Sequence, residues 1–146
     1  MGSKTQLIKV IADSLRTIEG IKRVRIGGRE ELRSFKDFPI INIAHLGGSE
    51  SYVSAPGTKT DNMRLQITLA AVKPAGADNN DLYFDTVQLG GVLIMFEQML
   101  DALDAMNGAA IFDNQQYDYQ ITEDGGKIFY DLTVTAQTQS FQEGNR

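Results

Sequence analysis

The sequence predicts one α+β domain, in which two helices pack on one face of a mostly antiparallel sheet of about five strands. Helical periodicity appears in two separate segments, strict alternation appears between them, and a hairpin pattern closes the chain. We expect all of residues 1–146 to form this domain, since 146 residues with 42% apolar side chains suffice for one core. The expected order is helix, three strands, helix, two strands.

The first predicted helix covers residues 4–19, where apolar residues recur at spacings of one, three and four positions. These residues are Leu7, Ile8, Ile11, Leu15 and Ile18. Residues 21–27 then alternate between apolar and charged side chains, which predicts a half-buried strand with Val24 and Ile26 on one face. A charged loop is expected over residues 28–38.

Two more strands and one long loop are expected in the middle of the chain. Residues 40–46 are apolar at nearly every position, which indicates a strand covered on both faces. The polar segment of residues 47–60 is rich in Gly and Ser and is predicted to be a long loop. Residues 63–71 show the clearest alternation, with one face formed by Met63, Leu65, Ile67, Leu69 and Ala71.

A second helix and a hairpin complete the predicted fold. After a loop at residues 75–81, the helix is expected over residues 82–106, where the Gly90-Gly91 pair predicts a kink or a close backbone approach. The hairpin is expected from residues 111–122 and 127–138. Its second strand is followed by residues 139–146, which are predicted to be a flexible tail.

Charge is distributed unevenly along the chain, although its net value is only −5. Residues 1–73 hold 12 basic and 7 acidic residues, whereas residues 74–146 hold 2 basic and 12 acidic ones. The two halves could mix their charges on one surface, or the folded subunit could have a positive and a negative surface suited to head-to-tail assembly. Nucleic-acid binding through the basic cluster is a third interpretation, which the overall acidity weakens. That cluster consists of Lys22, Arg23, Arg25, Arg29, Arg33 and Lys36.

No pattern in the sequence favours an enzyme, so we expect no catalytic residue. The absence of Cys excludes thiolate catalysis and Cys-based zinc sites, and His45 is the only histidine. Glu97, Asp101 and Asp104 share one helix face, which is more typical of a solvated face than of a cation site. We therefore predict no metal, no cofactor and no small-molecule substrate. No apolar run approaches the ~20 residues of a spanning helix, so no membrane partner is expected.

The chain resembles the tail terminator proteins of tailed bacteriophages, the group of lambda minor tail protein U-like tail completion proteins. The resemblance rests on an opening helix, a short strand at residues 21–27 and the Phe38-Pro39 start of an apolar strand. It continues through a long loop, an alternating strand, a helix rich in Leu and Asp, and the late segment of residues 119–126. It spans about residues 4–137.

The resemblance implies a structural virion protein that forms a ring, usually of six subunits, at the head-proximal end of the tail. The ring would cap the tail tube, stop its polymerisation and join it to the head–tail connector or neck protein. Its partners would be further copies, the tail tube protein and that connector, with DNA only as passing cargo and with assembly in the host cytoplasm. The residues expected at these interfaces are Lys22, Arg23, Arg25, Arg29, Arg33, Tyr52, Lys59, Asp101 and Asp104.

Two alternatives stay open at this point. The chain could be another neck or head–tail joining protein. It could also be a small ligand-binding regulatory domain of the α+β class, in which residues 47–60 and the sheet form the wall of a pocket.

Overall fold

The computed structural model describes residues 3–52, 58–72, 92–106, 111–121 and 127–141. Within these ranges the chain forms two α-helices, one 3-10 helix and five strands, in the predicted order. The elements are α1 (Ser3–Leu15), β1 (Arg23–Ile26), η1 (Arg29–Ser34), β2 (Ile40–Tyr52), β3 (Thr58–Val72), α3 (Val92–Asp104), β4 (Ile111–Ile121) and β5 (Lys127–Phe141). The predicted α+β class is confirmed.

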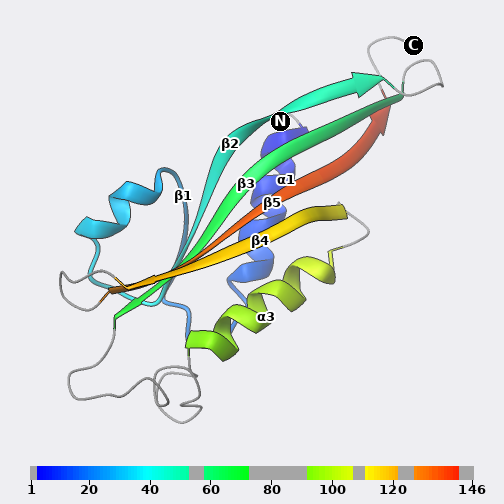
Figure 1. Cartoon of the computed structure of the whole chain (residues 1–146). Helices are drawn as coiled ribbons and strands as arrows, with labels where there is room; N and C mark the ends of the chain where they lie inside the picture. The colour runs from blue at the N-terminus through cyan, green and yellow to red at the C-terminus, as the bar shows by residue number, and fades with distance from the viewer. Residues whose placement is uncertain (1–2, 53–57, 73–91, 107–110, 122–126, 142–146) are drawn as a thin grey trace.

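The five strands form one sheet in the order β1-β2-β3-β5-β4. All neighbouring pairs are antiparallel except β1 and β2, which run parallel. A parallel pair requires a crossover, and the segment that contains η1 provides it. Helices α1 and α3 lie on one face of the sheet and η1 lies on the other (Figure 1). The sheet is therefore mostly antiparallel, as predicted, with β1 as the exception.

The main core lies between the sheet and the two helices. The alternation of β3 places Leu65, Ile67 and Leu69 in this core, each with no exposed surface. Helix α3 contributes Phe96, whose ring stacks on that of Tyr130 with centroids 4.8 Å apart. Fully burying side chains of this size contributes about 1.5–3 kcal/mol each, so this layer dominates the stability of the domain.

A second, smaller core lies on the opposite face, beneath η1. It consists of the buried residues Leu32, Ile40, Ala70 and Phe129, with Phe35 and Phe38 packed against them. Strand β2 serves both cores, because Ile40 faces this one while Ile41 faces the helices. The first part of the strand predicted at residues 40–46 is thus covered on both faces, whereas His45 and Leu46 at its end are exposed. Residues 28–38, predicted to be a loop, instead contain the packed helix η1.

The loop predicted at residues 47–60 is wrong for residues 47–52 and 58–60, which are strand, while residues 53–57 lie outside the described residues. Strand β2 continues to Tyr52 and β3 already begins at Thr58. The two strands stay paired up to Tyr52 and Lys59, with a bulge between His45 and Gly47. Gly48 suits this ribbon because a Cβ at that position would lie only 2.1 Å from the backbone oxygen of Asn62. The Gly and Ser residues of this segment show no apolar alternation, because backbone pairing and not buried apolar side chains holds this part of the strand.

Three smaller expectations also differ from the structure. Helix α1 ends at Leu15, after which hydrogen bonds such as that from the Ile18 amide to the Leu15 carbonyl tighten the chain. Ile18 remains buried, which explains why the apolar period continues past the helix. Ile26 lies on the same face of β1 as Val24 but is 53% exposed, so burial on that face ends before the strand does. Residues 139–141 belong to β5 and not to a flexible tail.

Several predictions fall outside the described residues. They are the loop at 75–81, the first part of the predicted helix at 82–91 with its two glycines, and the turn at 123–126. Among the helices that the structure describes, none has the length and apolar character needed to cross a bilayer.

Candidate interaction surfaces

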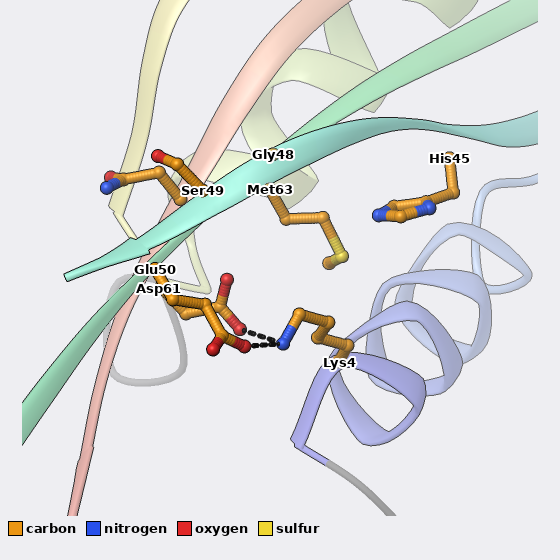
Figure 2. A pocket seen from close by; sticks show the side chains of 8 residues that line it. Lys4, His45, Gly48, Ser49, Glu50, Asp61 and Met63 are labelled. Carbon is orange, nitrogen blue, oxygen red and sulfur yellow. Dashed lines mark hydrogen bonds and ion pairs between the residues drawn. The ribbon is translucent and has the colours of Figure 1, made fainter.

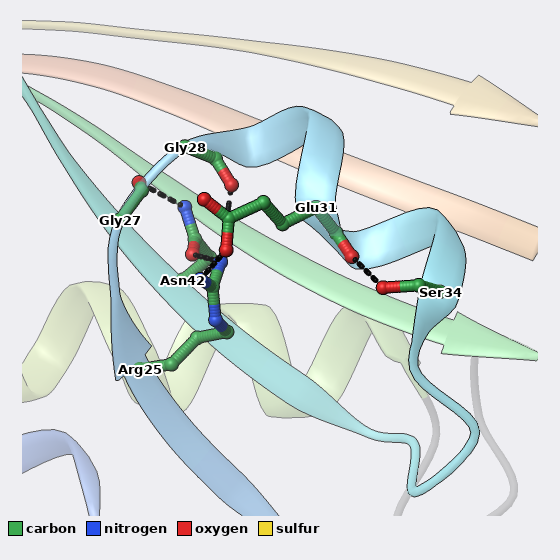
Figure 3. A network of polar contacts seen from close by, with 6 residues as sticks. All are labelled: Arg25, Gly27, Gly28, Glu31, Ser34 and Asn42. Atoms are coloured by element: carbon green, nitrogen blue, oxygen red, sulfur yellow. Dashed lines mark hydrogen bonds and ion pairs between the residues drawn. The ribbon is translucent and has the colours of Figure 1, made fainter.

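The basic cluster contains a buried polar network centred on Arg25 (Figure 3). The Arg25 guanidinium donates hydrogen bonds to the Asn42 side-chain oxygen, the Glu31 carboxylate and the Gly28 carbonyl. Asn42 is fully buried in β2 and donates in turn to the Gly27 carbonyl at 3.1 Å. The network links β1, β2 and the start of η1, so Arg25 holds the fold together at this point.

Two further arginines of the cluster are also paired within the chain. The Nε atom of Arg23 lies 2.8 Å from a carboxylate oxygen of Asp37, and its guanidinium covers the ring of Phe35. The Nε atom of Arg29 lies 2.7 Å from Oδ1 of Asp131 and its guanidinium covers the ring of Phe129. Positive charge on this face is therefore largely balanced, and among the described side chains Lys22 and Lys36 are exposed beside it.

The other predicted interface residues lie in three separate places. Arg33, the remaining arginine of the basic cluster, belongs to η1. Tyr52 and Lys59 are paired residues of β2 and β3, at the end of β2 that is far from β1. Asp101 and Asp104 are exposed on α3, which lies on the opposite face of the sheet from η1 (Figure 1). The structure therefore does not gather the nine residues into one site.

The acidic residues of α3 form a solvated helix face, as the sequence indicates. Glu97, Asp101 and Asp104 are all exposed, while Met95, Phe96 and Met99 of the same helix are buried. Across the part of the chain that the structure describes, no group of three His, Asp or Glu side chains is placed to hold a metal ion.

A cavity of about 330 Å³ lies between the first turn of α1 and the extended part of β2 and β3 (Figure 2). The Lys4 ammonium reaches from α1 to the carboxylate of Glu50 and to Oδ2 of Asp61, the latter at 3.0 Å. The hydrogen bonds that Lys4 donates, first to Glu50 and then to Asp61, raise its pKa. The cavity is lined by Lys4, His45, Gly48, Ser49, Glu50, Asp61, Asn62 and Met63.

Asp61 is the unusual residue of this cavity. It is only 4% exposed, and its Oδ1 atom is buried without a hydrogen-bond partner among the described residues. A buried carboxylate oxygen without a donor destabilises the fold, because it has lost its hydrogen bonds to water and has formed none within the protein. This combination makes the cavity a candidate binding site.

Sequence reasoning missed Lys4 and Asp61, although a signal for Asp61 was available. Asp61 has the same parity as Met63 and Leu65, so a charged side chain stands on the buried face of a strand. Lys4 gave no such signal, because it lies 46 residues from Glu50 in the sequence and only the folded chain brings the two together. Of residues 47–60, which one alternative made the wall of a pocket, Gly48, Ser49 and Glu50 line this cavity, and they do so as paired strand and not as loop.

Comparisons with known proteins complete this description. No protein-family model matches the sequence, and no curated protein sequence matches it. Among solved structures, the chain is similar to one from the virion of a native gene transfer agent particle. That likeness has a TM-score of 0.36 and 12% sequence identity, and it covers 94% of this chain and 92% of the other. A likeness of this degree carries no conclusion about function.

Proposed function

We propose that the protein is a structural subunit of a tailed virion that assembles with copies of itself into a ring at the head-proximal end of the tail. In this role it ends the growth of the tail tube and joins the tube to the head–tail connector. The observation that carries the proposal is the exposure of unlike charges at separate places on the fold, with Lys22 and Lys36 beside β1 and η1 and three carboxylates on α3. The order of its elements, which resembles that of tail terminator proteins, also supports it.

The charges suit a head-to-tail contact between identical subunits. Lys22 and Lys36 are exposed beside β1 and η1, whereas Glu97, Asp101 and Asp104 are exposed on α3. A contact between two different surfaces of the same chain closes into a ring when its rotation permits. Because three arginines of the basic cluster are already paired with carboxylates, the exposed lysines carry this attraction.

The ring would meet different partners on its two sides. One side would pair with the last ring of the tail tube and the other with the connector, while DNA passes through the centre. The net charge of −5 fits such a passage, because an acidic subunit has low affinity for phosphate. No residue acts as a catalyst in this proposal, and it requires no cofactor.

A charge-exchange experiment tests the ring. We expect Lys22→Glu and Asp101→Lys each to reduce assembly, measured by light scattering over a concentration series and by negative-stain images with purified tail tubes. The double variant is expected to recover part of the assembly, because the pair is restored with reversed sign. Glu19→Lys is the matched control, since Glu19 is exposed and belongs to neither surface.

Two outcomes would contradict the proposal. One is a protein that stays monomeric at every concentration and also in the presence of tubes. The other is a double variant that assembles no better than either single variant while all three remain folded.

A further inference from the structure

Among the described residues, nothing pairs with the outer edge of β2 along most of its length. Strand β1 pairs only with residues 40–43 of β2, and no other described strand pairs with the outer side of residues 44–52. This edge stands beyond η1 and runs along the upper part of the sheet (Figure 1). An open edge of this kind presents unpaired amide and carbonyl groups, which form a template for another extended segment.

The cavity lies directly beneath this edge. His45, Gly48 and Glu50 of β2 line it, and Lys4 of α1 closes its other side (Figure 2). A strand added to the outer side of β2 would direct every second side chain toward the face that carries α1. One such side chain would therefore enter the cavity, which is large enough for a long one.

The charges of the cavity select a basic side chain. Glu50 and Asp61 both present carboxylates to this cavity, and Lys4 donates to each of them. Asp61 also holds the buried oxygen atom without a donor. The Lys4 side chain is 43% exposed and pairs with the other oxygen, Oδ2, so a second donor can approach Oδ1 of Asp61 without replacing Lys4.

We propose that the open edge of β2 binds an extended basic segment of a different protein, and that a Lys or Arg side chain of this segment enters the cavity and donates a hydrogen bond to Asp61. Backbone pairing along residues 44–52 supplies affinity, and the cavity supplies selectivity for Lys or Arg at one position. This inference does not depend on whether the protein ends a phage tail.

A peptide titration tests the proposal. The probe is a capped peptide of about seven residues that alternates Val and Thr around a central Arg, compared with the same peptide carrying Gln at the centre. We expect saturable NMR shifts and slower hydrogen exchange for the amides of residues 44–52. The Gln peptide is expected to bind about tenfold more weakly, because it offers no charged donor to a buried carboxylate.

Two substitutions assign the selectivity to the cavity. Asp61→Asn is expected to remove most of the preference for Arg over Gln, while Asp118→Asn, at an exposed position on β4, should leave it unchanged. Thermal unfolding checks that each variant is folded. If Asp61→Asn does not fold, Glu50→Gln serves instead, because the Glu50 side chain is 42% exposed and its loss should lower the preference.

The proposal is overturned if neither peptide binds up to about millimolar concentration, if both bind equally, or if the shifts appear on β4. The source of the natural segment follows from a dilution series of the protein alone. Concentration-dependent shifts at residues 44–52 would assign the segment to a second copy and overturn the proposal, whereas their absence together with peptide binding would support a different protein. A protein that binds the peptide but forms no ring would disprove the proposed function and leave this inference intact.

Discussion

Among single residues, Asp61 has the environment that least suits its chemistry. Its carboxylate is almost fully buried, and only one of its oxygen atoms has a donor, the ammonium of Lys4. Burying a charge is tolerated only when it is paired, so Lys4 offsets a cost that no other described side chain offsets. The ion pair also fixes the first turn of α1 against β3.

This pair predicts a specific dependence of stability on pH. The pKa of Lys4 is raised above 10.5 by the hydrogen bonds of Glu50 and Asp61. A raised pKa contributes stability that is fully present below the unfolded value and is lost as the pH rises through the folded value. Wild type should therefore be more stable than Lys4→Gln at neutral pH, and the difference should shrink as the pH rises above 10.5.

Urea unfolding at a series of pH values measures this difference. Lys9→Gln is the control, because Lys9 is exposed on the same helix. A Lys4→Gln deficit that stays constant across the whole alkaline range would contradict the assigned cause.

Among the elements, η1 is the one whose packing is easiest to test. Leu32 of η1 has no exposed surface, whereas Leu46 at the bulge of β2 is 42% exposed. We expect Leu32→Ala to lower the free energy of unfolding by about 2–5 kcal/mol. The same change at Leu46 should cost less than about 0.5 kcal/mol. Denaturant unfolding measures both, and equal effects would show that η1 is not packed on the sheet.

The predictability of each element follows from where its stability arises. Residues 63–71 were predicted correctly because every second side chain enters the main core, and this leaves a period of two in the sequence. Residues 47–52 were misassigned because they are held by the backbone ladder with β3, which leaves no such period. The charged segment around η1 has the pattern of a loop, because Leu32 is the only fully buried side chain among those described there and one residue makes no periodicity.

For the candidate interfaces, the sequence shows which residues are charged but not which of them form contacts in the folded chain. The sequence displays the basic cluster plainly, but Arg29 meets Asp131 across a separation of 102 residues. Such pairing depends on the sheet order and leaves no local pattern. For the same reason, the sequence could not reveal that the cluster is largely balanced within the chain.

At the scale of the whole molecule, the proposed ring predicts a response to salt. Attraction between exposed charges is screened as the Debye length falls from about 10 Å at 0.1 M salt to about 3 Å at 1 M. Sedimentation of the protein should therefore show less ring and more monomer as NaCl is raised over this range. Asp101→Lys should flatten the response, and assembly that does not respond to salt would argue against a contact between the two charged surfaces.

The position of β5 has a consequence for how the chain is made. This strand lies between β3 and β4, yet it follows both of them in the sequence, and Thr58 finds its partner only at Phe141. During synthesis, the edge of β3 that pairs with β5 stays unpaired until nearly all of the described residues have left the ribosome. Contacts of such long range form slowly and leave strands exposed meanwhile. Newly made chains are thus most prone to aggregation before β5 has emerged, so the demand for chaperones should be highest in that interval.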